Sequence, residues 1–201
     1  MTYTTSRYPV HLIDVVRMVD GTPITIRPTL PQDVNLLRTF FRTLSDASRY
    51  RRFMTPLKEL PDALAERFAD IDYHHHLALL AEVFDDAGQE TVIAEARYVM
   101  DESDPGTCEI ALAVADEWQS HGIARTLLGR LEWQAVTSGI RRMCADMLIS
   151  NQAMRGLALR AGYAIRASRD DAEMARLEKV IPAEESNPDL ARSTAGWAPA
   201  A

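Results

Sequence analysis

The stretch that decides the fold runs Val114-Ala115-Asp116-Glu117-Trp118-Gln119-Ser120-His121-Gly122-Ile123-Ala124-Arg125. It follows an apolar run at residues 110–114, which is typical of a buried strand, and it stops abruptly in polar residues and a glycine. Apolar residues then recur at helical spacing, at Ile123, Leu127, Leu128 and Leu131. The pattern predicts a strand, a tight turn and the first turn of a helix.

A helix that begins directly after a tight turn presents unpaired backbone N–H groups and a partial positive charge. Such a turn is a ready site for an anion, above all the phosphate of a nucleotide-like cofactor. The small residues Gly122 and Ala124 let a ligand approach the backbone closely. The stretch carries neither the G-x-G-x-x-G of a dinucleotide-binding fold nor the G-K-[ST] of a P-loop.

The composition is that of a globular chain. It has 201 residues, 47% of them hydrophobic, which is enough for one well-buried core. No apolar run reaches the ~18 residues that span a bilayer, and residues 1–7 are too polar for a signal peptide. Cys108 and Cys144 lie in apolar, strand-like runs, so buried thiols are favoured over a disulfide and a cytoplasmic location is expected. A net charge of −7 argues against nucleic acid as a partner.

The remaining patterns predict a mixed α/β (α+β) chain. Helices are expected at about 31–44, 61–69, 123–138 and 152–161, and strands at 24–26, 77–84, 91–100, 107–114, 141–149 and 163–167. Short connections within 77–114 favour an antiparallel meander. Residues 174–181 have local helical character, with a strand as the alternative. The arginine-rich stretch 45–54 is interpreted as a solvated face, with a role in holding a phosphate as the alternative. One domain is expected over 1–181 and a flexible tail over 182–201.

The spacing Gln119-x-x-Gly122-x-Ala124 resembles the acyl-CoA pyrophosphate loop of the GNAT acetyltransferases, Gln/Arg-x-x-Gly-x-Gly/Ala. Other stretches extend the resemblance over about residues 8–181, and they are most similar to the branch of bacterial protein lysine acetyltransferases. In order, they are Tyr8-Pro9, Asp20-Gly21-Thr22, Arg27-Pro28, Leu44-Ser45-Asp46-Ala47-Ser48-Arg49-Tyr50-Arg51-Arg52-Phe53, Asp72-Tyr73, Glu109-Ile110-Ala111 and Asn151-Gln152-Ala153-Met154.

The resemblance implies the GNAT fold, a mixed, mostly antiparallel sheet with flanking helices, whose central strands splay apart to admit a pantetheine arm. It favours a strand at 174–181. It implies acetyl-CoA as co-substrate, with its pantetheine along Leu112, Ala113 and Val114 and near Asn151. The residues implied at the pyrophosphate are Gln119, Ser120, His121, Gly122, Ile123, Ala124 and Arg125.

The activity that the resemblance implies is direct acetyl transfer to an amine, either a protein lysine or a small amine. A non-catalytic acyl-CoA sensor is the alternative from a different class. Transfer needs a proton acceptor, a donor for the developing oxyanion and a proton for the leaving sulfur. The backbone N–H of Val114 is the candidate oxyanion donor. Ala158 stands where many small-substrate relatives carry a tyrosine acid, so water or the ammonium would protonate the sulfur.

Glu109 is the candidate general base. It interrupts an apolar strand, where a charge is costly unless it faces a cleft or solvent. Burial beside apolar neighbours would raise its pKa toward a useful value, whereas a solvent-facing position is the structural alternative.

The run His74-His75-His76 does not predict a metal site, because adjacent histidines in an extended segment point to opposite faces. His121 is expected near phosphate oxygens rather than as a base, and Trp118 as a packing residue. The oligomeric state stays open, with a homodimer as one option.

Overall fold

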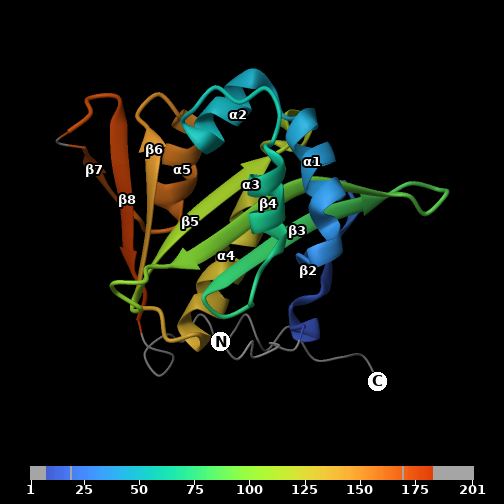
Figure 1. The fold of residues 1–201 in the computed structure, drawn as a ribbon, viewed down its shortest axis with the longest axis horizontal. Helices are drawn as coiled ribbons and strands as arrows, with labels where there is room; N and C mark the ends of the chain where they lie inside the picture. The colour runs from blue at the N-terminus through green and yellow to red at the C-terminus, as the bar shows by residue number, and fades with distance from the viewer. Residues whose placement is uncertain (1–7, 19, 169, 183–201) are drawn as a thin grey trace.

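The computed structural model describes residues 8–18, 20–168 and 170–182 (Figure 1). They form an eight-stranded sheet in the order β1-β2-β3-β4-β5-β6-β8-β7. All neighbouring strands are antiparallel except β5 and β6, which are parallel. The strands are β1 (Asp14–Arg17), β2 (Pro23–Pro28), β3 (His76–Phe84), β4 (Glu90–Met100), β5 (Thr107–Val114), β6 (Arg142–Leu148), β7 (Ala164–Ala167) and β8 (Met174–Val180).

Helices cover both faces of the sheet. They are α1 (Val34–Thr43), α2 (Asp46–Phe53), α3 (Asp62–Ala69), α4 (Ile123–Thr137) and α5 (Gln152–Arg160), with 3-10 turns at Val10–Leu12, Pro31–Asp33 and Asp116–Trp118. In Figure 1, α1 and α3 lie in front of β3 and β4, and α4 lies behind the sheet. The arrangement is the mixed, mostly antiparallel sheet with flanking helices that the resemblance implies.

The larger core fills the space between the sheet and α4. Cys108, Ile110 and Val114 alternate along β5 and pack in one cluster with the α4 residues Leu127 and Leu131. On the opposite face Ala113 packs with Leu37 and Phe40 of α1. Every second residue of the strand and every third or fourth residue of the helix therefore pack into the same core.

Two elements differ from the sequence expectations, and a third settles an ambiguous segment. The arginine-rich stretch forms α2, which begins because the Ser45 hydroxyl accepts a hydrogen bond from Ser48 N (3.2 Å). The short strand β1 was not predicted. The segment 174–181 forms β8, so the strand implied by the resemblance is confirmed against the local helical pattern. Apart from Pro182, the expected tail lies outside the described residues.

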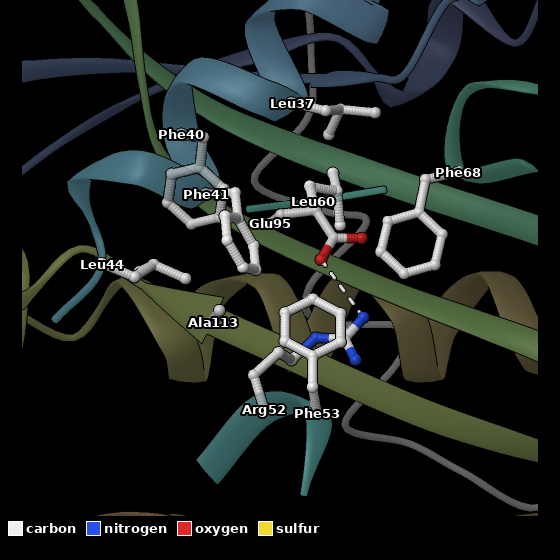
Figure 2. A pocket seen from close by; sticks show the side chains of 10 residues that line it. All are labelled: Leu37, Phe40, Phe41, Leu44, Arg52, Phe53, Leu60, Phe68, Glu95 and Ala113. Atoms are coloured by element: carbon white, nitrogen blue, oxygen red, sulfur yellow. Dashed lines mark ion pairs between the residues drawn. The ribbon is translucent and has the colours of Figure 1, made fainter. Parts of the chain in front are cut away.

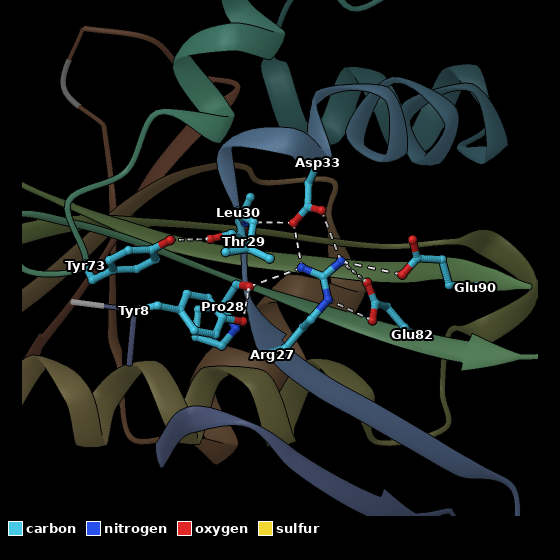
Figure 3. A network of polar contacts seen from close by, with 9 residues as sticks. All are labelled: Tyr8, Arg27, Pro28, Thr29, Leu30, Asp33, Tyr73, Glu82 and Glu90. Atoms are coloured by element: carbon cyan, nitrogen blue, oxygen red, sulfur yellow. Dashed lines mark hydrogen bonds and ion pairs between the residues drawn. The ribbon is translucent and has the colours of Figure 1, made fainter. Parts of the chain in front are cut away.

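A buried ion cluster ties β2 to β3 and to the start of α1 (Figure 3). The Arg27 guanidinium contacts Asp33 (Nη1–Oδ2, 2.6 Å) and Glu82 (Nη2–Oε1, 2.6 Å), and both carboxylates are almost fully buried. Tyr8 and Tyr73 add hydrogen bonds to the carbonyls of the adjoining chain, Pro28 O (3.1 Å) and Thr29 O (3.0 Å). The Arg27-Pro28 motif therefore holds β2, β3 and the start of α1 together, and neither residue lines the cleft described below.

Within the described part of the chain, the helices are all too short or too polar to cross a bilayer.

Candidate active site

The central feature is the parting of β5 and β6. The two strands are paired only at Thr107–Arg142, Cys108–Met143 and Glu109–Cys144. β5 continues to Val114 along β4, while its other edge beyond Glu109 pairs with no strand of the described residues. The predicted splay of the central strands is present.

The splay turns backbone donors toward the gap. Ala115 N donates to Ile93 O (2.8 Å), so Ala115 bonds toward β4. Because N–H directions alternate along an antiparallel strand, the N–H groups of Val114 and Leu112 point the other way, into the gap. These donors lie where a bound carbonyl would find them.

A cleft of about 430 Å³ opens beside the unpaired end of β5, and it is bounded by the end of β5, the start of α4, α5 and α2. Ten of the residues predicted to bind the cofactor line it: Leu112, Ala113, Val114, Gln119, Ser120, Gly122, Ile123, Ala124, Arg125 and Asn151. His121 is not part of the lining; its Nδ1 lies 2.8 Å from Gln119 O and its side chain is exposed. Trp118 lines the cleft and also packs on the core, as expected.

The start of α4 leaves its first N–H groups without helical acceptors. The helix's first i to i−4 bond runs from Thr126 N to Gly122 O (3.1 Å), so the N–H groups of Ile123, Ala124 and Arg125 remain available to an anion. Gly122 has φ +85° and Ser120 has φ +66°. A Cβ on Gly122 would meet no protein atom within 4 Å, so the protein itself needs glycine there for its left-handed backbone.

The remaining lining includes α2, for which the sequence analysis gave a role in holding a phosphate only as the alternative to a solvated face. Ser48, Arg51 and Arg52 contribute to the wall of the cleft. The Ser45-x-x-Ser48 spacing is a helix-capping signal that was available in the sequence. Across the cleft, Asn151 caps α5, because its side chain accepts a hydrogen bond from Met154 N (3.1 Å).

Asp116 fastens α2 to the loop that follows β5. Its carboxylate accepts hydrogen bonds from Ser45 N, Ser45 Oγ and Ser48 Oγ, each at 2.8 Å. Partial burial raises the pKa of Asp116, but these hydrogen bonds outweigh it and the pKa lies below the usual value. The carboxylate is therefore charged at neutral pH.

A second set of contacts connects α2 to β4, beside a water-sized cavity of about 20 Å³ (Figure 2). Glu95 and Arg97 of β4 are 3% and 4% exposed and are hydrogen-bonded to each other. Arg52 of α2 reaches down to Glu95 (Nη2–Oε2, 3.6 Å), and the Arg97 guanidinium stacks 3.7 Å from the centre of the Phe68 ring. Arg52 is thus largely buried, and the solvated-face interpretation is wrong for it.

Glu109 lies on the same face of β5 as Ala113, opposite Val99 on one side and Cys144 on the other. Its side chain is exposed, so the expected burial is wrong and the solvent-facing alternative holds. Nearby, Arg176 contacts Asp146 (3.0 Å) and the Cys144 sulfur (3.0 Å). Glu109 itself forms neither an ion pair nor a side-chain hydrogen bond within the described residues, so its carboxylate is free to meet a substrate.

The cysteines and Ala158 carry no chemistry of their own. Cys108 and Cys144 are free and buried, as expected. Burial raises the pKa of Cys108 to about 12 and also raises that of Cys144, which disfavours the nucleophilic thiolate. Ala158 is 1% exposed and packs in the main core rather than facing the cleft.

Hydrogen bonds to the Asp72 carboxylate fix the backbone of the run His74-His75-His76. One oxygen of this carboxylate accepts hydrogen bonds from the backbone N–H groups of His74 (3.0 Å), His75 (2.8 Å) and His76 (2.9 Å). The His76 ring is turned inward, with Nε2 3.0 Å from Arg97 Nη1. Within the described residues no set of three or more His, Cys, Asp or Glu side chains is placed to hold a metal ion.

Comparison with known proteins agrees with this geometry. A family model described as the acetyltransferase (GNAT) family matches residues 40–163. The chain belongs to the GNAT acetyltransferase family. The sheet whose central strands part beside a helix start is accordingly the GNAT fold, and the chain is an acetyltransferase by family. Other proteins with this fold, 19% identical to the chain, have been solved with acetyl-CoA.

Three relatives show where this GNAT chain stands. The acetyltransferase PA5475 of Pseudomonas aeruginosa is 34% identical over 152 residues, which cover 76% of this chain and 81% of that protein. The acetyltransferase Pat of Mycolicibacterium smegmatis is 32% identical over 73% of this chain and only 43% of its own length. The crystal structure of the GNAT domain of S. lividans PAT has a TM-score of 0.78 and 29% identity, covering 87% of this chain and all of that one.

Proposed function

We propose that the chain transfers the acetyl group of acetyl-CoA to the side-chain amine of a protein lysine, by direct attack in a ternary complex. One observation carries this proposal: β5 and β6 part after Glu109 directly beside the unpaired N–H groups at the start of α4. The gap suits a narrow thioester arm, and the helix start suits the phosphates at its other end.

Different residues around the cleft would hold different parts of acetyl-CoA. The N–H groups of residues 120–125 would hold the pyrophosphate. Leu112, Ala113 and Val114 would accompany the pantetheine along β5, with Asn151 on the opposite wall. His121 is exposed beside this loop and would meet phosphate oxygens only at their outer side. Bound acetyl-CoA supplies the activated thioester.

The proposed base and oxyanion donor are well separated. Glu109 and Val114 stand five residues apart on one strand, which corresponds to about 17 Å between their Cα atoms. Glu109 would therefore take the proton of the attacking ammonium through water molecules if the thioester oxygen is held at Val114 N–H. The N–H of Leu112 points into the same gap and lies nearer to Glu109, so it offers a second donor along the same edge.

The leaving sulfur needs no dedicated side chain in this arrangement. Position 158 is an alanine rather than a tyrosine, and its side chain is buried in the core, so it cannot supply a proton. Water in the exposed mouth of the cleft, or the ammonium proton itself, would neutralise the thiolate.

An exposed sheet face supports a protein acceptor. Glu109, Asp146 and Arg176 are all exposed, and the strand register places them on one side of β5, β6 and β8. A lysine on the surface of a folded partner can reach a carboxylate on such a face, whereas a small amine gains few contacts there.

The test is free-thiol release from acetyl-CoA with a panel of small amines and acyl-CoA synthetase-type proteins, together with mass spectrometry of the products. We expect turnover and a lysine-linked acetyl group with at least one protein. Turnover with small amines alone would show that the acceptor is a small amine and not a protein lysine. Affinity for acetyl-CoA without any turnover would show that the chain is a non-catalytic acyl-CoA sensor.

A further inference from the structure

A continuous chain of hydrogen bonds joins the end of β5 to the first turn of α2. The side-chain amide of Gln119 donates to Val114 O (3.1 Å) and to Ser48 Oγ (3.3 Å). Ser48 in turn donates its only hydroxyl proton to Asp116 Oδ1 (2.8 Å). Ser48 is 8% exposed and Gln119 is half-buried, so the bond between them is largely shielded from water, whereas Asp116 at the end of the chain is exposed.

The direction of every bond in this chain is fixed. A backbone carbonyl can only accept, so the amide nitrogen of Gln119 must be the atom that faces Val114 O. Asp116 is a charged carboxylate that accepts from Ser45 and Ser48, so the Ser48 hydroxyl can only accept from Gln119. Gln119 thereby uses both amide protons on the protein.

We infer that Gln119 is a positioning residue that locks the end of β5 to α2, and that its side chain is not a ligand of the cofactor. This inference rests on the proposed function and deepens it. It assigns a role to the run Leu44 to Phe53, whose serines reach Gln119 and Asp116 and whose Arg51 and Arg52 form one wall of the cleft. Acetyl transfer would depend on Gln119 through the placement of β5 and α2.

The test replaces Gln119 by Met, which keeps the size of the side chain and removes both donors. We expect the affinity for CoA, measured by calorimetry, to change less than about threefold, because backbone N–H groups hold the phosphates. We expect kcat at saturating acetyl-CoA to fall about tenfold or more, because misplacing reacting groups by 1 Å costs up to about a hundredfold. Amide exchange of residues 46–53 in the ligand-free protein should become faster.

Ser48→Ala is the second variant, and it should speed exchange of residues 46–53 in the same way. The Ser48→Ala, Gln119→Met double variant should be no worse than the more severe single variant, because both changes break one chain. Gln134→Met is the matched control. Its amide also donates to a serine hydroxyl, Ser138 Oγ (3.3 Å), but at the far end of α4. Neither kcat nor exchange of residues 46–53 should change in that variant.

Two results would overturn the inference. In the first, Gln119→Met weakens CoA binding tenfold or more with kcat at saturation unchanged, which would make the side chain a ligand. In the second, Gln119→Met leaves exchange of residues 46–53 unchanged, which would show that it does not hold α2. The exchange measurement needs neither CoA nor an acceptor. It therefore tests whether Gln119 holds α2 even if the proposed acetyltransferase activity is not found.

Discussion

Glu109 pairs with Cys144 at the last register position that β5 and β6 share, and beyond this pair the two strands separate. The proposed base therefore stands where the two strands begin to part, outside the lining of the cleft, while the backbone donors of the cleft continue along β5. A substrate amine approaching from the face that carries Glu109 would pass the carboxylate before it reached the gap.

Glu109→Gln should lower kcat by about a hundredfold or more while the affinity for acetyl-CoA stays near the wild-type value, because only the proton acceptor is lost. Steady-state kinetics at saturating acetyl-CoA across pH 7–9 measures this. Glu178→Gln is the control, since Glu178 lies on the same face next to Cys144 and pairs with Arg142 (3.4 Å). Near-normal turnover of Glu109→Gln over that pH range would remove Glu109 from the mechanism.

Gly122→Val should abolish measurable binding of acetyl-CoA. The side chain would stand where a phosphate is proposed to meet the first turn of α4, and φ +85° adds backbone strain of about 1–2 kcal/mol. Calorimetric titration with CoA and a thermal unfolding curve separate the two effects. Gly129→Val is the matched control, because Gly129 lies mid-helix on α4 and a Cβ added there also meets no atom within 4 Å outside its own helix turn. Normal affinity in Gly122→Val would place the phosphate elsewhere.

The sequence pattern predicted those parts of the site that are formed by residues close together in the chain. The strand, the turn and the helix start around Gly122 follow from the chain's own alternation and spacing. α2 was missed because its sequence, Asp46–Phe53, carries few apolar residues. Its place is fixed by Asp116 and Glu95, which are distant in sequence, and no local pattern reveals such partners.

Two further cases show the same limit. β8 looks helical in isolation, but pairing with β6 along its whole length overrides that preference. For Glu109, alternation along the strand shows that it faces away from Ile110. It does not show how far along β5 the helices on that second face extend, and they leave Glu109 exposed, so the expected burial was wrong.

Arg27→Met should lower the free energy of unfolding by about 3–5 kcal/mol, because it leaves the buried carboxylates of Asp33 and Glu82 facing each other without a cation. Burial already raises the pKa of Glu82 with the guanidinium in place. Urea unfolding measures the loss. Arg38→Met is the control, since Arg38 pairs with the exposed Asp62 (2.8 Å) and should cost no more than about 1 kcal/mol. Equal losses in the two variants would contradict a structural role for the Arg27 cluster.

His76 should make the fold acid-sensitive. Burial, reinforced by the neighbouring Arg97, lowers its pKa to about 4, against about 6.5 in the unfolded chain. Between these values the unfolded chain binds the extra proton and the folded chain does not. The corresponding stability, about 2–3 kcal/mol, is therefore complete above pH 6.5 and is lost as the pH falls to 4.

Urea unfolding at pH 7, 6, 5 and 4 for the wild type and His76→Gln measures this contribution. The variant has no group to protonate, so its stability should fall less steeply over this range, by about the same 2–3 kcal/mol. His75→Gln serves as the control, because His75 is 67% exposed and should leave the pH dependence nearly as in the wild type. Parallel curves for the wild type and His76→Gln would show that His76 takes up its proton at the same pH in the folded and the unfolded chain, and that its contact with Arg97 is not made as the structure has it.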